Sequence, residues 1–140
     1  MSSDLESIVV TKLKTVDIDG GNVLHFIKKS DESYLDFGEA YFSLVDNKRI
    51  KAWKKHKEMV MNLAVPYGEV KFIFFDNKLL NFREEIIGYK NYSRITVPSN
   101  IWFGFQGMAD PHSLIINFAN IEHNDNEVER MNLNNISYDW

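Results

Sequence analysis

Cysteine is absent from this chain of 140 residues, and long apolar runs are scarce. Without cysteine, neither disulfide bonds nor thiolate metal sites can form. No apolar run approaches the roughly 20 residues that a membrane-spanning helix needs. The N-terminal stretch MSSDLESIVV carries acidic side chains where a secretory signal peptide has basic ones. These absences predict a soluble protein that does not contact membranes and works in the cytoplasm.

Positive charge is also in short supply, because the formal net charge is −4. A chain with this balance is a poor general partner for nucleic acid. Its basic residues are nevertheless clustered, since six of the sixteen lie within ten positions: Lys48, Arg49, Lys51, Lys54, Lys55 and Lys57. A local basic patch on an acidic protein favours a small anionic ligand such as a diphosphate. The alternative interpretation is a solvated basic edge strand that discourages aggregation.

Strand-forming residues, in contrast, are abundant, with 44% hydrophobic and 14% aromatic residues. Turn signals divide the chain into about eight or nine short strands, which is typical of a sandwich, jelly roll or small barrel. The strands are predicted at 7–15, 23–27, 39–45, 49–65, 69–75, 79–87, 93–97, 101–105 and 114–119. A short helical segment is predicted within residues 124–132. No repeat or linker interrupts the sequence, so residues 1–140 are predicted to be one domain.

The centre of the prediction is the stretch 49–76, which joins the basic cluster to two apolar runs. It is predicted as a hairpin of two strands connected by a Pro-Tyr-Gly turn. Strict alternation places Lys54 and His56 on one face and Lys51 and Trp53 on the other. Ionisable side chains are costly to bury inside a barrel. An inward-facing pair of this kind therefore indicates a functional site.

Five segments of the chain follow one another in the order FGEAYFS, IKAWKKHK, NLAVPYGEVKFIFFD, ITVPSNIWFGFQG and ISYDW. In this order they resemble the dTDP-4-dehydrorhamnose 3,5-epimerase family, and in particular its short, divergent branch. The similarity extends over roughly residues 17–140.

The resemblance implies a fold and a chemistry. The fold is a cupin, an all-β double-sheet jelly roll that is usually dimeric and holds its active site inside the barrel. Family members act in the cytoplasm on nucleotide-linked 4-keto-6-deoxy sugars, without a metal or an organic cofactor. A histidine removes a proton next to the keto group, a tyrosine on the opposite face returns one, and a lysine stabilises the enolate.

Carried over position by position, the resemblance places Lys54 where the family has its base histidine and Lys51 where an arginine binds the diphosphate. The position of the enolate-stabilising lysine falls near Met59, and that of a second histidine falls on Phe103. His56 follows two positions after Lys54, on the same face. Lys54 and His56 are therefore predicted to act as an altered acid/base pair, since desolvation lowers the pKa of a lysine. The alternative is that Lys54 only binds phosphate and His56 only lines the cavity.

Tyr138 is assigned as the acid on the far face of the sugar, with Tyr41, Tyr67, Tyr89 and Tyr92 as open alternatives. Six residues are predicted to bind the substrate: Lys51, Glu39, Tyr41, Asn62, Trp102 and Phe103. The competing interpretations are core packing for the aromatic side chains and hydrogen bonds to the backbone for the polar ones.

The four histidines do not predict a metal site. Many cupins hold a metal ion with two histidines, a glutamate and a later histidine, whereas here only His56 and Glu58 are close in sequence. The later ligand position is occupied by Phe103. The remaining histidines have no matching spacing: His25, His112 and His123.

Two functions from different classes remain open at this point. The first is a homodimeric epimerase or isomerase of nucleotide-linked 4-keto-6-deoxyhexoses in surface-polysaccharide biosynthesis. The second is a non-catalytic cupin that binds a sugar or nucleotide sugar and has lost the catalytic histidines. The substitutions at Lys54, Met59 and Phe103 favour the second function, while the polar pair and the basic strand favour the first.

Overall fold

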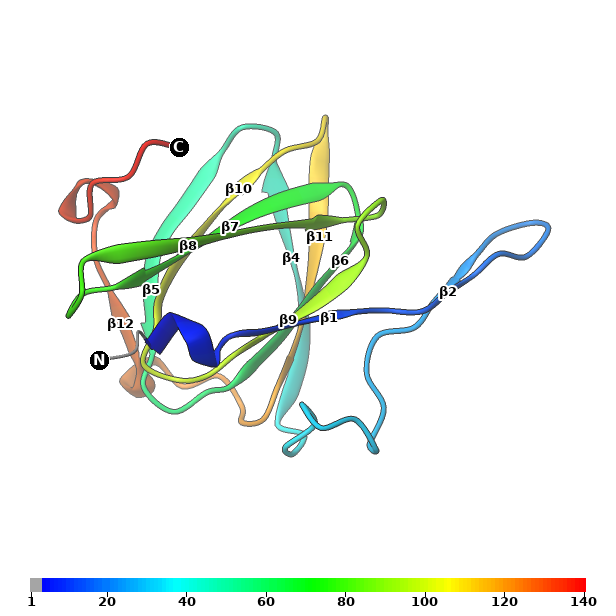
Figure 1. Cartoon of the computed structure of the whole chain (residues 1–140), viewed down its shortest axis with the longest axis horizontal. Helices are drawn as coiled ribbons and strands as arrows, with labels where there is room; N and C mark the ends of the chain where they lie inside the picture. The colour runs from blue at the N-terminus through cyan, green and yellow to red at the C-terminus, as the bar shows by residue number, and fades with distance from the viewer. Residues whose placement is uncertain (1–3) are drawn as a thin grey trace.

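In the computed structural model, which describes residues 4–140, two antiparallel five-stranded sheets pack face to face (Figure 1). The first sheet has the order β1 (Val9–Lys12), β9 (Ser93–Val97), β6 (Met61–Tyr67), β11 (His112–Ala119) and β4 (Glu39–Asp46). The second has the order β12 (Val128–Arg130), β5 (Ile50–His56), β10 (Trp102–Gly107), β7 (Glu69–Asp76) and β8 (Asn81–Gly88). The predicted all-β, double-sheet jelly roll is confirmed.

The remaining elements are short. β2 (Thr15–Val16) and β3 (Val23–Leu24) form a small hairpin that projects from the barrel (Figure 1). Three single 3-10 turns are η1 (Asp4–Ser7), η2 (Asp125–Glu127) and η3 (Leu133–Asn135). The predicted C-terminal helical segment is thus reduced to η2, which Asn124 caps by accepting from the backbone N–H of Asn126, and β12 follows directly. Within residues 4–140, no helix is long and apolar enough to cross a membrane.

The main core fills the space between the two sheets. Leu63 and Val65 of β6 face Phe72 and Phe74 of β7 there, and all four side chains are buried. Burying each such side chain contributes about 2 kcal/mol. β7 is apolar on both faces because its outer face is covered too: Ile73 packs with Trp53, Trp102 and the C-terminal segment. The core occupies one part of the barrel and leaves the rest open for a cavity.

The stretch 49–76 forms three strands, so the predicted two-stranded hairpin is wrong. β5 belongs to the second sheet and β6 to the first, and the chain returns to the second sheet at Gly68. β6 and β7 therefore face each other across the core instead of pairing edge to edge. Consecutive apolar strands can bury their side chains in either arrangement, and the apolar pattern does not distinguish the two.

Gly68 is the point where the chain turns between the sheets, with a φ of +86°. An alanine Cβ at this position would overlap the side chain and backbone of Ser113, whose hydroxyl bonds both the N–H and the C=O of Glu69. We expect Gly68→Ala to lower the free energy of unfolding by about 3 kcal/mol. Gly20→Ala is the matched control, because its φ is +92° but no atom lies within 4 Å of the added Cβ. Urea unfolding measures both, and equal losses would show that backbone conformation alone matters.

Candidate active site

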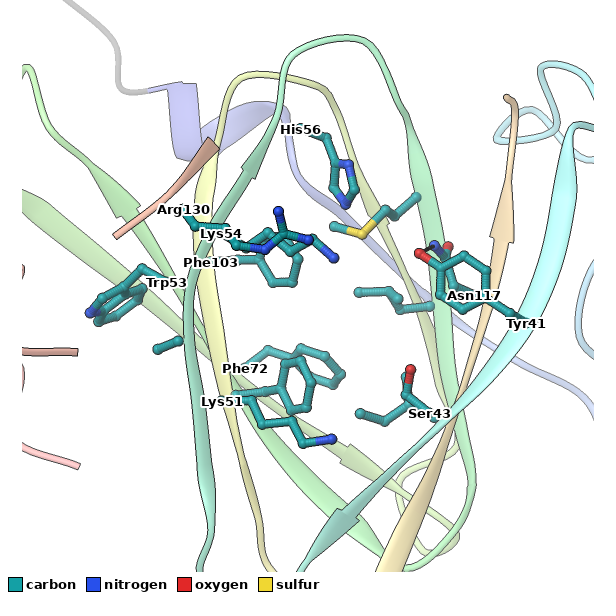
Figure 2. A pocket seen from close by; sticks show the side chains of 15 residues that line it. Tyr41, Ser43, Lys51, Trp53, Lys54, His56, Phe72, Phe103, Asn117 and Arg130 are labelled. Carbon is teal, nitrogen blue, oxygen red and sulfur yellow. Dashed lines mark hydrogen bonds between the residues drawn. The ribbon is translucent and has the colours of Figure 1, made fainter. Parts of the chain in front are cut away.

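A cavity of about 340 Å³ lies between the two sheets (Figure 2). Its apolar wall includes Phe72, Phe103 and Phe105 of the second sheet and Leu63 and Ile115 of the first. Its polar lining comes from β4, β5, β11 and β12: Tyr41, Ser43, Lys51, Lys54, His56, Asn117 and Arg130. The site therefore combines a low-dielectric wall with converging ionisable groups.

A bulge in β5 decides which of its side chains enter the cavity. Along the pairing of β5 with β10, Phe103 lies opposite Lys54 and the next residue, Gly104, lies opposite Ala52, so Trp53 is an extra residue. Ala52 and Trp53 both pack on the outer face, where Trp53 Nε1 donates to the carbonyl of Leu133. The predicted strict alternation is therefore wrong for Lys51, which points into the cavity together with Lys54 and His56 (Figure 2).

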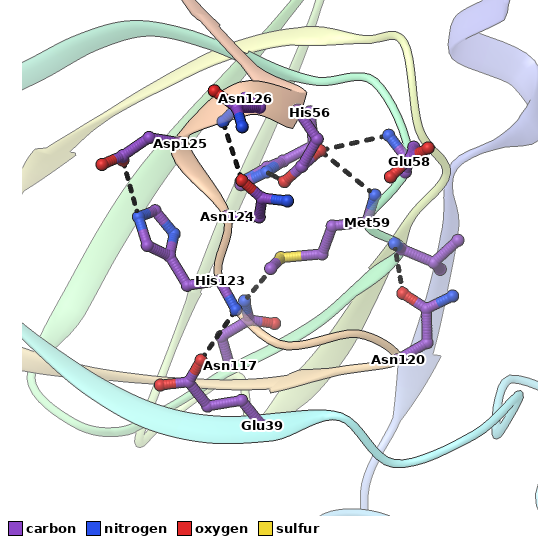
Figure 3. Close-up of polar contacts among 12 residues, drawn as sticks. Glu39, His56, Glu58, Met59, Asn117, Asn120, His123, Asn124, Asp125 and Asn126 are labelled. Carbon is purple, nitrogen blue, oxygen red and sulfur yellow. Dashed lines mark hydrogen bonds and ion pairs between the residues drawn. The ribbon is translucent and has the colours of Figure 1, made fainter.

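His56 forms a buried pair with Glu127, a residue that was not predicted to belong to the site. His56 Nδ1 lies 2.6 Å from Glu127 Oε1. The second carboxylate oxygen accepts hydrogen bonds from the backbone N–H groups of Glu58 and Met59 (Figure 3). Pairing of Val128 with His56 in the β12–β5 ladder brings the carboxylate to this position. Glu127 is thus fixed at both oxygens and holds the imidazole ring in one orientation.

The protonation states of this pair follow from its surroundings. Burial lowers the pKa of His56 below its ordinary 6.5, against the opposing effect of Glu127. Burial by itself would raise the pKa of Glu127, but hydrogen bonds from His56 and from the backbone outweigh it, and the pKa is lowered. The pair at neutral pH is therefore a neutral imidazole that donates from Nδ1 to a carboxylate. His56 Nε2 has no hydrogen-bond partner within the described residues, so its lone pair is free to accept a proton.

Three basic side chains give the cavity its positive charge: Lys51, Lys54 and Arg130. Arg130 lies opposite Lys54 in the β12–β5 ladder and was not predicted, because its strand was expected to be helical. Burial lowers the pKa of Lys54, and the nearby Arg130 guanidinium lowers it further. Lys51 Nζ donates to the carbonyl of Leu44 at 2.8 Å. Within residues 4–140 none of the three forms an ion pair with a carboxylate, so all can receive an anion.

Tyr41 lines the wall opposite His56, since β4 belongs to the first sheet and β5 to the second (Figure 2). Asn117 Nδ2 donates to the Tyr41 hydroxyl oxygen at 3.0 Å. Burial raises the pKa of Tyr41, so the phenol keeps its proton at neutral pH. The hydroxyl in turn donates to the sulfur of Met59 at 4.0 Å, a weak acceptor.

Phe103 stands at the position of the second histidine of the family, and its ring packs on His56. Its ring stacks on the His56 ring, with centroids 6.0 Å apart and an interplanar angle of 18°. Phe103 thus lines the cavity as predicted, as an apolar cover over the imidazole. This contact desolvates His56 and contributes to its low pKa.

Two predicted polar residues lie outside this cavity. Glu39 accepts a hydrogen bond from the backbone N–H of His123. Asn62 donates to the carbonyl of Ser33 and accepts from the hydroxyl of Thr96. Both side chains therefore satisfy neighbouring polar groups outside the cavity, as the competing interpretation holds.

Two predicted aromatic residues also lie outside the cavity, on the outer face of the second sheet. Trp102 is buried in the outer cluster, and Lys55 Nζ lies 5.2 Å from its ring centroid. The Tyr138 hydroxyl donates to Glu84 Oε2 at 2.7 Å, and its ring packs on Phe82. Burial and the Glu84 carboxylate raise the pKa of Tyr138 to about 12. The structure thus separates Tyr138 from His56 and Lys54.

Metal ligands do not cluster in the described part of the chain. Within residues 4–140, no three His, Asp or Glu side chains are arranged so that they could share a metal ion.

A scan against models of known protein families finds no match. Among curated proteins, the chain is 28% identical over 112 residues to a probable low-salt glycan biosynthesis epimerase of Haloferax volcanii, covering 72% of this chain and 70% of that protein. Among solved structures, a dTDP sugar isomerase from Desulfovibrio desulfuricans superimposes with a TM-score of 0.91 and 28% identity, over 100% of this chain and 94% of that chain. The predicted resemblance to the dTDP-4-dehydrorhamnose 3,5-epimerase family is confirmed.

Two structures of lower identity share the fold of this epimerase-like chain. A dTDP-6-deoxy-D-glucose-3,5-epimerase from Legionella pneumophila, in complex with dTDP-4-keto-L-rhamnose, has a TM-score of 0.80 and 13% identity over 95% of this chain and 78% of that chain. A sugar 3,4-ketoisomerase from Thermoanaerobacterium thermosaccharolyticum, in complex with TDP, has a TM-score of 0.77 and 16% identity over 94% and 93%. These two structures support the fold, whereas the similarity to nucleotide-sugar epimerases and isomerases comes from the two proteins of 28% identity.

Proposed function

We propose that this chain is a cytoplasmic enzyme of glycan biosynthesis that moves a proton at the carbon next to the keto group of a dTDP-4-keto-6-deoxyhexose. The outcome of that step is an epimerised or isomerised sugar. The observation that carries the proposal is the His56–Glu127 pair, held in a cavity with a free imidazole nitrogen. The similar proteins named above are sugar isomerases and epimerases, and two of those structures contain TDP or a dTDP-linked keto sugar.

His56 is proposed as the base. The keto group acidifies the neighbouring C–H, and a neutral imidazole held by a carboxylate can accept its proton. The Glu127 carboxylate then stabilises the imidazolium that forms, and its fixed position prevents the ring from turning away. Glu127 is a positioning residue in this scheme.

Tyr41 is proposed as the acid that returns a proton from the opposite wall, in place of Tyr138. Its hydroxyl keeps the proton at neutral pH and accepts a hydrogen bond from Asn117. A protonated phenol on the face of the sugar opposite to the base is what inversion of the carbon requires.

Lys51 and Arg130 are proposed to bind the diphosphate. Their side chains converge on the cavity, and within residues 4–140 neither forms an ion pair with a carboxylate. A guanidinium can bind two phosphate oxygens at once, whereas an ammonium acts as a point charge. The phenyl rings of the cavity wall can pack against the base or sugar of the ligand.

The non-catalytic binding protein remains the competing function, and proton exchange distinguishes the two. The protein is incubated with dTDP-4-keto-6-deoxyglucose in D₂O, and the C3 and C5 proton signals are followed by NMR. Loss of either signal that depends on the protein is the expected result. Binding in a calorimeter without any loss of signal would instead support the binding protein and refute the enzyme.

Replacing Tyr41 with phenylalanine separates proton removal from proton return. We expect Tyr41→Phe to retain deuterium exchange, because His56 is untouched, and to form the inverted sugar about 100-fold more slowly. NMR of the product in D₂O measures both quantities in one experiment. Tyr89→Phe is the control, since the Tyr89 hydroxyl is bonded by Asn22 on an exposed surface. Inversion at an unchanged rate would assign the acid to another group.

We also propose that the protein is a homodimer that uses the outer face of the first sheet. Phe42, Leu44 and Tyr67 are 67%, 53% and 56% exposed. Leu114 lies opposite both Leu44 and Tyr67 in the two ladders of β11, so the patch is continuous across three strands. A contiguous apolar patch of this kind marks an interaction surface. We expect light scattering to give twice the mass of 16.4 kDa, and Leu44→Glu to give the monomer.

A further inference from the structure

The Lys54 amine is the free amine in the cavity. Within residues 4–140 it forms neither an ion pair nor a side-chain hydrogen bond among the described contacts. Lys51, the other cavity lysine, has its Nζ tethered to the carbonyl of Leu44. The Lys54 amine therefore lines the cavity without being held by another side chain.

The neighbours of Lys54 favour the unprotonated amine. Across the ladders of β5, the aromatic Phe103 lies opposite Lys54 on one side and the cationic Arg130 on the other. Burial and the Arg130 guanidinium lower the pKa of Lys54, while Glu127 acts in the opposite direction. Desolvation and an adjacent cation are the two devices that make a lysine nucleophilic near neutral pH.

The position where the family resemblance places its enolate-stabilising lysine carries no charge here. Met59 stands there, is fully buried, and contacts Asn117 through its sulfur. Without that lysine, the enolate oxygen formed when His56 removes the proton is less stabilised, which favours an electron acceptor other than the keto oxygen. An iminium nitrogen is such an acceptor, because it takes the electron pair of the broken C–H bond without forming an oxyanion.

We propose that Lys54 Nζ forms a covalent iminium ion with the keto carbon of the sugar, next to the carbon from which His56 removes the proton. The proposal rests on the proposed function, because it requires a keto sugar in this cavity. His56 and Lys54 lie on the same face of β5, two positions apart, so both nitrogen atoms face one ligand (Figure 2). In this scheme Lys54 acts as a catalytic nucleophile, although it stands at the sequence position of the family's base histidine.

The steps balance without an oxidant or a reductant. The Nζ lone pair bonds to the keto carbon, and the keto oxygen leaves as water with one proton from the amine and one from the medium. His56 Nε2 then takes the proton from the adjacent carbon, and the electron pair of that C–H bond forms the double bond of an enamine. Reprotonation of that carbon restores the iminium ion. Water adds to it, and the keto sugar and the free amine are released.

Reduction with cyanoborohydride tests the proposal. The full-length protein is incubated with dTDP-4-keto-6-deoxyglucose and sodium cyanoborohydride, which delivers hydride to an iminium carbon and leaves a stable secondary amine. We expect intact-mass spectrometry to show one added sugar nucleotide and peptide mapping to place it on Lys54. Deuterium exchange is measured on the same preparation. Exchange without an adduct would overturn the iminium ion and leave the proposed function standing, whereas neither exchange nor adduct would refute both.

Two variants assign the adduct. Lys54→Arg keeps the positive charge but has no nucleophilic amine, so we expect no adduct and at least about 100-fold slower exchange. Lys55→Arg is the matched control, because Lys55 lies on the same strand outside the cavity and pairs with Glu129, and it should retain the adduct on Lys54. Exchange at the wild-type rate in Lys54→Arg, or an adduct spread over surface lysines, would overturn the proposal. Mapping of the wild-type adduct decides the question even if Lys54→Arg does not fold.

Discussion

Replacing His56 with asparagine should slow deuterium exchange next to the keto group by about 1,000-fold. The free Nε2 of a neutral imidazole can accept a proton, whereas an amide cannot at neutral pH. Binding of dTDP should persist, because Lys51 and Arg130 remain in the cavity. NMR in D₂O measures the exchange, and calorimetry with dTDP measures the binding.

The control for this variant is His112→Asn. His112 begins β11, packs near the ring of Tyr67 and does not line the cavity, so exchange should be unchanged. Thermal unfolding checks that His56→Asn is folded, since the substitution leaves Glu127 buried without its partner. A folded His56→Asn protein that exchanges as fast as the wild type would remove His56 from the chemistry and favour the non-catalytic binding protein.

The layout of the fold could be predicted from the sequence because it follows from local patterns. Strand β9 was predicted with its observed bounds, and β4 to within one residue. The pairing of strands across 49–76 could not be predicted from the sequence. Two buried apolar strands show the same sequence pattern whether they pair in a hairpin or lie on opposite walls of a barrel. Topology depends on contacts between residues far apart in sequence, and an apolar run does not specify its partner.

The candidate site was predicted in part, and the errors have definite physical causes. Lys54, His56, Lys51, Tyr41 and Phe103 line the cavity as expected. Lys51 enters the cavity only because the bulge at Trp53 reverses the alternation of side chains along β5. No residue in the segment KAWKKHK predicts a bulge. Lys51 was thus assigned to the cavity although its predicted facing on β5 was wrong.

Glu127 was missed because nothing in its sequence surroundings marks it. It lies among polar residues after Glu122, in a stretch expected to be solvated and helical. Its burial arises from the pairing of β12 with β5, which places it against His56. One signal was available: a base histidine in a barrel needs an acceptor for its second nitrogen, so a search for a carboxylate partner of His56 would have included Glu127.

Glu127→Gln should slow exchange at least about 100-fold while the protein remains folded. The glutamine oxygen is needed by the N–H groups of Glu58 and Met59, which leaves the amide NH₂ to face His56 Nδ1. Nδ1 must then accept, so the ring proton moves to Nε2. An imidazole protonated at Nε2 has no lone pair directed into the cavity, and it cannot remove the proton of the sugar.

The pH profile distinguishes this positioning role from a merely structural one. In the wild type, the limb of the kcat/KM profile that reports His56 should lie below pH 6.5, because burial lowers the pKa of His56. Glu127 opposes that shift, so loss of its charge should move the acid limb of Glu127→Gln to a still lower pH. Glu129→Gln, whose carboxylate pairs with Lys55 on the surface, is the matched control and should leave rate and profile unchanged. A slower Glu127→Gln enzyme with an unshifted acid limb would mean that the carboxylate supports the fold but does not set the state of His56.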